Sequence, residues 1–274
     1  EITALLLDMS AAGAATFNST IASSVITAKS AGNTSSALIV QQTGNTDGWG
    51  LTPDNTNGNL DFVRIGGGAG TYFRIANDGS LSTPTAGTSN VRFGVNAGNS
   101  IASGGNFNVF VGDEAGTAIS TGDANVAVGY QALATEDAHG TAVAVGFQAL
   151  NALNAGADSY NTAVGTQAGV LVTTGIRNTL IGGLAGDSLT DADLNVAIGY
   201  QALSTDTLGS RSVAIGNQAL LSQNFTSATN AFNTAIGTDA GLLVTTGIQN
   251  VYVGGLTGDG ATTGNDNTGV GYQS

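Results

Sequence analysis

The single histidine, His139, is the residue with the most versatile chemistry in the chain. It follows Glu136 and Asp137 in the segment EDAHG, which lies between two copies of a repeat. A catalytic triad would need a serine, this histidine and an acid to converge in one pocket. No serine has the sequence context of a nucleophile elbow. We therefore interpret His139 as an exposed loop residue and predict no catalytic residues.

The acidic residues do not form the pair that a glycosidase needs. Asp113 and Glu114 are adjacent, so on a strand their side chains would point to opposite faces. Asp8, Asp61 and Asp78 lie on or beside predicted strands, with no histidine or cysteine as a partner. The sequence is therefore not typical of an enzyme.

The sequence contains only weak indications of ion, phosphate or sugar sites. The segments 189–195 and 258–267 carry Asp and Asn that could bind Ca²⁺, but they lack the spacing of known calcium loops, and solvated turns are the alternative. The glycines at 66–68 and 182–183 form no phosphate loop, and Lys29 is the only lysine. The patterns at Asn18, Asn33 and Asn224 match glycosylation acceptors, which chance produces in such a chain. We predict no metal and no cofactor.

Two sets of surface residues could contact a ligand directly. The Thr pairs 173–174 and 245–246 are similar to flat ice-binding ladders, but they recur only every fourth repeat. Four aromatic residues could stack on sugars, and the alternative is packing against a neighbouring coil or chain. These four each follow a repeated glycine: Tyr130, Phe147, Tyr200 and Tyr272.

Composition excludes several classes of protein. Glycine accounts for 42 of 274 residues, charged residues for 9%, and the net charge is −13, which argues against binding nucleic acid. Cysteine is absent, so disulfide scaffolds and thiolate metal sites are excluded. No apolar run approaches the roughly 18 residues of a membrane span, so we expect no membrane insertion.

A glycine-anchored repeat dominates the chain from residue 90 onward. Nine of the eleven copies open with Asn. Each then reads Val or Thr, a variable residue, a large apolar residue, Gly, two variable residues and a small residue, mostly Ala. The anchor spacing is 17 residues, with insertions of one, two and four, and four units form a block that returns after 70 to 72 residues. The anchor glycines are Gly94, Gly112, Gly129, Gly146, Gly165, Gly182, Gly199, Gly216, Gly237, Gly254 and Gly271.

The repeat predicts an all-β, elongated β-solenoid or β-roll of about eleven 17-residue coils. The β-branched residues three and one positions before each anchor predict a short strand that buries this face and leaves the residue between them free. The glycine suits a positive φ or a close backbone approach, and the asparagine suits a turn or a ladder between coils. Because a thin coil has a small core, we expect association with further copies.

The repeat cores NVAVG, SVAIG, NVAIG and NTAIG resemble the head repeats of trimeric autotransporter adhesins. The longer pattern NTAVGTQAG, followed by TTG and NTLIG, resembles the repeat arrays of phage tail fibres. The resemblance to the adhesins implies a left-handed parallel β-roll that three chains form about a common axis. The period of 17 differs from the shorter repeat of the adhesins.

The remaining third of the chain predicts two smaller parts. Residues 1–36 resemble the shaft repeats of phage fibres, residues 37–89 predict a small β module, and residues 90–274 form the repeat array. Because the chain opens at Glu1 in what reads as a strand, we expect a fragment or a processed form. Strands are expected at Ala37–Gln41, Gly48–Thr52, Leu60–Ile65 and Thr71–Ala76.

These features predict a structural protein rather than an enzyme. We expect a segment of a homotrimeric phage tail fibre or viral appendage that supports host attachment, outside the cell, with a host glycan or receptor as a further partner. The alternative is a bacterial cell-surface adhesin or filament that binds polysaccharide.

Overall fold

The computed structural model describes residues 38–41, 48–54, 59–65, 70–75, 77, 81–82 and 86–274. The predicted shaft repeats of residues 1–36 lie outside the described residues. Within the described ranges the chain forms strands and turns and no helix, which confirms the all-β prediction. No helix there could cross a membrane.

The first sheet is antiparallel, with its five strands in chain order. The four strands expected here are confirmed to within two residues at each end, while the fifth, β5, was not predicted. Phe62 and Phe73 pack edge to face on this sheet, with ring centroids 5.4 Å apart. The strands are β1 (Leu38–Gln41), β2 (Gly48–Asp54), β3 (Asn59–Ile65), β4 (Gly70–Ile75) and β5 (Leu81–Ser82).

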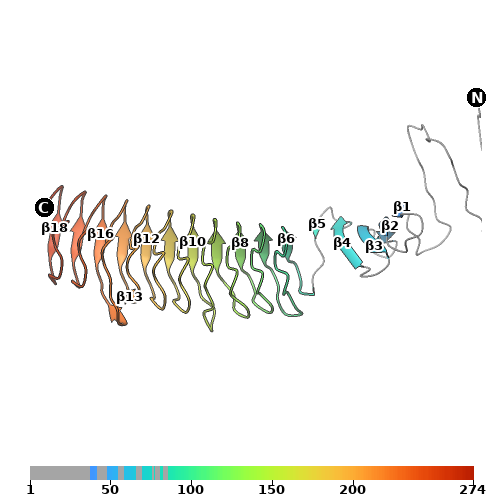
Figure 1. Cartoon of the computed structure of the whole chain (residues 1–274), viewed down its shortest axis with the longest axis horizontal. Helices are drawn as coiled ribbons and strands as arrows, with labels where there is room; N and C mark the ends of the chain where they lie inside the picture. The colour runs from blue at the N-terminus through green and yellow to red at the C-terminus, as the bar shows by residue number, and fades with distance from the viewer. Residues whose placement is uncertain are drawn as a thin grey trace, which may run out of the picture.

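The repeat array folds as a parallel β-solenoid of eleven coils, as predicted (Figure 1). Each repeat copy supplies one three-residue strand, and neighbouring strands pair in register, as Val196 does with Thr179 and Val213. The strands are β6 (Val91–Phe93), β7 (Val109–Val111), β8 (Val126–Val128), β9 (Val143–Val145), β10 (Thr162–Val164), β11 (Thr179–Ile181), β12 (Val196–Ile198), β14 (Val213–Ile215), β16 (Thr234–Ile236), β17 (Val251–Val253) and β18 (Thr268–Val270).

Insertions into the repeat extend the coils without disturbing this register. The longest insertion adds four residues between Gly216 and Gly237. It pairs β15 (Thr229–Asn230) with β13 (Gly209–Ser210) in a small parallel sheet, which projects from the row of coils near β13 in Figure 1. The inserted residues therefore lie at the surface, and the spacing of the solenoid strands is unchanged.

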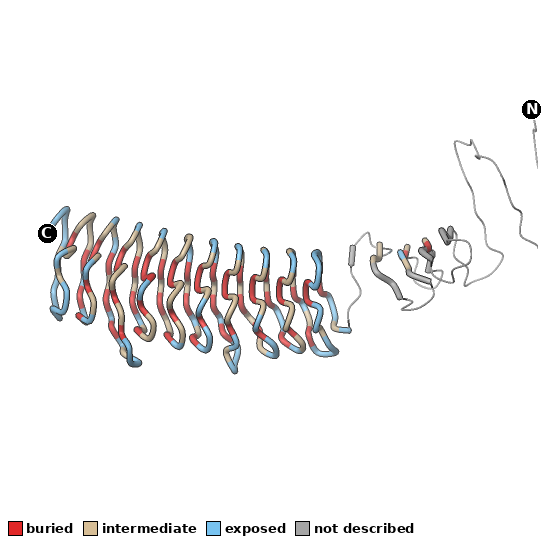
Figure 2. The backbone as a smooth tube through the Cα atoms, in the orientation of Figure 1, coloured by how far each residue is buried: buried red, intermediate tan, exposed pale blue. Residues whose placement is uncertain are grey.

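The prediction of which strand face is buried was wrong. In β8, β9, β12 and β14 the middle residue is buried, and the β-branched residues on either side are only half-buried. The buried residues form a continuous inner row from coil to coil (Figure 2). We call the residue two positions before each anchor glycine the inner residue, because its side chain lies inside the coil.

The inner residue and the residue four positions after the anchor compensate for each other in volume. Four of the six coils with Ala at the inner position carry Leu at the second position, as Ala144 does with Leu150 and Ala197 with Leu203. The other two, with Ala163 and Ala235, carry Gly there, and each precedes a coil with a large inner residue. Where the inner residue is Phe110, Leu180 or Tyr252, the second position of the same coil and of the preceding coil is glycine. A Cβ on Gly186 would lie 2.8 Å from the Leu180 side chain, so a larger residue would collide there.

The asparagines at the start of the repeats form a buried ladder. Asn178 Oδ1 accepts the backbone N–H of Asn195 at 2.9 Å, and Asn178 Nδ2 donates to the Ala192 carbonyl at 2.7 Å. The same pair of bonds occurs at eight asparagines: Asn90, Asn108, Asn125, Asn161, Asn178, Asn195, Asn233 and Asn250. The amides therefore satisfy turn backbone and link adjacent coils, which confirms both predicted roles.

The anchor glycines meet both demands predicted for them. Gly112 has a φ of +127°, and a Cβ built on it would lie 2.7 Å from the Gly129 carbonyl oxygen in the next coil. The small residue three positions after the anchor, such as Ala132 or Ala202, is fully buried. Glycine therefore permits both the turn and the close stacking of successive turns.

Candidate functional site

The outward face of the solenoid strands is the most extensive candidate site. It consists of the residues three and one positions before each anchor, which we call the outer stripe. Val164, Ile181 and Ile236 are 37–39% exposed. Across eleven coils at the spacing of paired strands, the stripe is about 50 Å long. Its 22 residues, none of them charged, are Val91, Phe93, Val109, Val111, Val126, Val128, Val143, Val145, Thr162, Val164, Thr179, Ile181, Val196, Ile198, Val213, Ile215, Thr234, Ile236, Val251, Val253, Thr268 and Val270.

Aromatic side chains border the outer stripe on one side, directly after the anchors. Tyr130 and Phe147 stack on each other with ring centroids 5.6 Å apart and planes 20° from parallel. Tyr200 lies over Gly183 and Tyr272 over Gly255 in the preceding coils. The predicted packing against neighbouring coils therefore occurs, although all four rings keep 45–72% of their surface exposed. Their outer faces remain available to a ligand or another chain.

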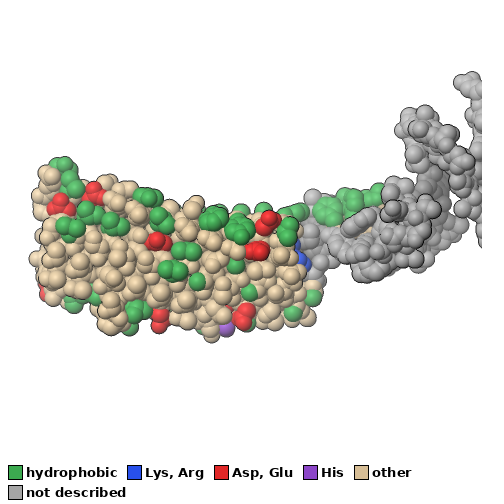
Figure 3. Space-filling view, viewed as in Figure 1, with side chains coloured by type: hydrophobic (Ala, Val, Ile, Leu, Met, Phe, Trp, Pro, Cys, Tyr) green, Lys and Arg blue, Asp and Glu red, His purple; other side chains and the backbone are tan. Residues whose placement is uncertain are grey.

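A second border, five positions before the anchors, was not identified from the sequence. It includes the exposed rings of Phe107, Tyr160 and Phe232. Arg211 lies over the Phe232 ring, 5.8 Å from its centroid. Counting this position against the anchors would have revealed the row, because its aromatic residues recur five positions before Gly112, Gly165 and Gly237. In Figure 3 hydrophobic side chains gather along the upper edge of the solenoid, while acidic side chains are scattered.

The loop around His139 brings its neighbouring acids together. Glu136 is 1% exposed, although the sequence indicated a loop at the surface. Its Oε1 lies 3.4 Å from His139 Nδ1 and accepts the His139 backbone N–H at 3.2 Å, and its Oε2 accepts the Ala155 N–H at 3.1 Å. His139 Nδ1 is buried without a hydrogen bond. The expectation of an exposed histidine is therefore wrong for this nitrogen.

The other acidic candidates have partners within the fold. Asp113 accepts the Val95 N–H and Glu114 accepts from the Gln131 amide, so these adjacent acids face different partners as expected. In segment 189–195, Asp191 accepts the Thr174 hydroxyl and Asp193 accepts the Ile176 N–H. These carboxylates stabilise turns between coils.

In the antiparallel sheet the acidic candidate Asp61 forms an ion pair with Arg74. Asp61 receives two hydrogen bonds of 2.7 Å from the Arg74 guanidinium. Asp8 and Asp78 lie outside the described residues, as do the glycines at 66–68. Within the described ranges, three or more Asp, Glu, His or Cys ligand atoms come together only at Glu136, Asp137 and His139.

The Thr pairs are used to join coils. The hydroxyls of Thr173 and Thr245 donate to the carbonyls of Thr190 and Thr262, one coil further on. Asn224, one of the glycosylation patterns, accepts the Thr207 hydroxyl at 3.2 Å. These hydrogen bonds support a structural role for the Thr pairs rather than an ice-binding ladder.

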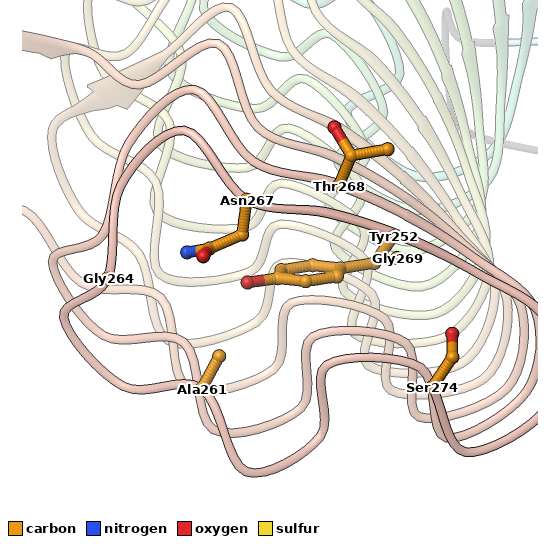
Figure 4. A pocket seen from close by; sticks show the side chains of 7 residues that line it. All are labelled: Tyr252, Ala261, Gly264, Asn267, Thr268, Gly269 and Ser274. Atoms are coloured by element: carbon orange, nitrogen blue, oxygen red, sulfur yellow. The ribbon is translucent and has the colours of Figure 1, made fainter.

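A cavity lies at the end of the solenoid, where Tyr252 and Asn267 line the interior of the last coils (Figure 4). Burial raises the pKa of the Tyr252 hydroxyl, which is buried without a hydrogen bond. In earlier coils the residues of the next coil fill the corresponding space. The cavity is therefore the open cross-section of the coil.

Comparisons with known proteins identified no relative of this chain. No family model matches the chain, and neither a curated protein nor a solved structure matches it. The functional argument therefore depends on the geometry of the solenoid.

Proposed function

We propose that the chain is a structural fibre protein, a segment of a homotrimeric viral tail fibre or appendage that supports host attachment. The observation that carries the proposal is the outer stripe. A single chain leaves these 22 aliphatic, threonine and phenylalanine side chains half-exposed along all eleven coils. Long apolar surfaces of this kind mark interaction sites in proteins.

A second copy of the same chain is the partner that fits this surface best. The stripe repeats once per coil, and another solenoid has the same repeat distance. The absence of charged residues from the stripe favours burial against an equally apolar face. The resemblance of the repeats to those of phage fibres and trimeric adhesins favours three copies about one axis.

The mass of the protein in solution tests this proposal. We expect a trimer, and the double variant Ile198→Asp/Ile215→Asp should be a monomer with unchanged β-sheet circular dichroism. Thr226→Asp/Ala228→Asp introduces the same two charges at exposed residues of the inserted loop, away from the stripe and its borders, so it should leave the trimer intact. A stable wild-type monomer would overturn the proposal, and a dimer would reject the threefold arrangement.

A bacterial surface adhesin or filament that binds polysaccharide is the second candidate. The exposed aromatic border favours it, because rings such as Tyr200 and Phe147 present flat faces on which sugars stack. Binding on a glycan array that Tyr200→Ala reduces would support this function. Neighbouring genes distinguish the two origins: tail genes indicate a virus, and a membrane-anchor domain on the same chain indicates a bacterium.

A further inference from the structure

The loop at Glu136 has an internal counterpart 70 residues further along the chain. Asp206 occupies the equivalent place and is also fully buried. Its Oδ1 accepts the N–H groups of Gly209 and Phe225, at 3.1 and 2.9 Å. Its Oδ2 accepts the Gln223 side-chain amide at 2.6 Å. Three donors therefore satisfy this buried carboxylate.

The carboxylate of Glu136 has one donor fewer. It keeps the two backbone N–H donors, from His139 and Ala155. The residue that corresponds to Gln223 is Leu153, which is fully buried and offers no donor. A buried carboxylate is costly unless its charge is compensated. The first loop therefore lacks the compensation that its counterpart has.

In place of the third donor, the first loop has an imidazole nitrogen. His139 corresponds to Gly209, and its buried Nδ1 lies 3.4 Å from Glu136 Oε1 without a hydrogen bond. Two ligand atoms that bind one tetrahedral ion at about 2.0–2.1 Å lie about 3.4 Å apart. The observed separation is therefore the one that a shared ion would produce.

Asp137 completes a set of three ligands and corresponds to Thr207 in the second loop. The ligand atoms of Glu136, Asp137 and His139 all lie within 4.8 Å of one another. Asp137 is exposed and His139 is partly exposed, so an ion can enter from solvent. One imidazole and two carboxylates suit a first-row transition ion better than Ca²⁺, which prefers oxygen ligands alone.

We propose that Glu136, Asp137 and His139 bind a divalent first-row transition ion, with Zn²⁺ as the best fit. The sequence predicted no metal site, and this inference does not depend on the fibre function. The bound ion compensates the charge of the buried Glu136 carboxylate. In the second loop the Gln223 amide compensates Asp206 instead. The ion also ties the first loop to the following coil, because Glu136 accepts the Ala155 N–H there.

Titration of the whole chain with ZnCl₂, followed by calorimetry and by the NMR signals of the imidazole ring, tests the proposal. His139 is the only histidine and the chain has no cysteine, so the imidazole signals have one source. We expect one Zn²⁺ per chain, shifted His139 signals and a higher melting temperature. His139→Ala and Asp137→Thr should each weaken binding at least about tenfold.

Two variants separate a metal site from a simple ion pair. Leu153→Gln introduces the donor of the second loop, so it should weaken Zn²⁺ binding while His139 is retained. Thr207→Ala changes the counterpart of Asp137 in the second loop, and it should leave binding unchanged. Binding that survives His139→Ala, or His139 signals that respond to protons but not to Zn²⁺, would overturn the proposal.

Discussion

The inner and outer faces of the solenoid strands differ in which residues vary along the array. From β7 to β17 the inner residue changes between Ala, Leu, Phe and Tyr, although it is buried in each of these coils. The outer stripe keeps Val or Thr at one position and, after Phe93, only Val or Ile at the other. The coils tolerate inner variation because the second position of the same coil and of the preceding coil changes with it. A single coil makes no such demand on the half-exposed outer face, so the uniformity there supports the association with further copies that we propose.

Two neighbouring residues on opposite faces provide the strongest test of this comparison. Ala197→Asp places a charge at a fully buried inner position, and we expect a loss of more than about 4 kcal/mol in unfolding free energy. Ile198→Asp places the same charge on the outer stripe, where the single chain should lose less than about 1 kcal/mol. Urea unfolding of the wild type and of each variant, at protein concentrations below those at which the chains associate, measures both. Equal losses would contradict the assignment of the faces.

The volume exchange inside the coil can be tested with a double variant. Leu180→Ala should cost about 2–5 kcal/mol, because it leaves a cavity between glycines. Adding Gly186→Leu reproduces the Ala and Leu combination of Ala197 and Leu203. Leu203 adopts a φ of +53°, close to the +55° of Gly186, so the backbone accepts leucine.

We expect this second substitution to recover at least about 1 kcal/mol of the loss in a double-mutant cycle. Gly186→Leu alone should destabilise the protein, because its side chain would meet Leu180. Additive losses in the double variant would show that the two positions do not compensate for each other.

A substitution in the asparagine ladder tests whether the buried turn groups need a side-chain hydrogen-bond partner. Asn178→Ala removes the acceptor of the Asn195 N–H and the donor to the Ala192 carbonyl, both buried. We expect a loss of about 1–3 kcal/mol. Asn217→Ala, at an exposed position, should change stability by less than about 0.5 kcal/mol. Similar losses for the two variants would argue against a structural role for the ladder.

Much of the fold follows from the sequence because two demands recur in every coil. The anchor glycine is needed for a backbone that L-residues rarely adopt, and it occurs in all eleven coils. The asparagine is needed for unpaired turn groups, and it occurs in nine coils, always four positions before the glycine. The faces could not be assigned in the same way. Alternation separates two faces without telling which is enclosed, and the small Ala144 or Ala197 is inside only because Leu150 or Leu203 fills the remaining space.

The loop sites were harder to predict, since a buried acid resembles an exposed one in sequence. Glu136 and Asp206 occupy a position where other coils have Ile119, Val172 or Leu189, all buried. Aligning this column would have indicated burial, but the hydrogen bonds that permit it come from residues three and 17 to 19 positions away. Such partners become visible only once the coils are stacked.

The smallest expected effect concerns Asp187, which lies on neither strand face. Burial raises the pKa of this carboxyl above its ordinary 3.8, while hydrogen bonds from the Ser204 hydroxyl, 2.5 Å away, and from backbone oppose the shift. A raised folded-state pKa means that the folded state holds the proton more tightly, so stability falls as pH rises through that pKa. Asp187→Asn should therefore be slightly more stable than wild type near pH 7 and similar to it below about pH 3.8. Ser204→Ala removes a hydrogen bond to the ionised carboxylate, so near neutral pH it should be less stable than Asp187→Asn by more than wild type is. Thermal unfolding of wild type, Asp187→Asn and Ser204→Ala between about pH 3 and pH 7 measures these differences. A wild-type protein that gains stability over Asp187→Asn as pH rises would show that the hydrogen bonds, and not burial, dominate at this contact between coils.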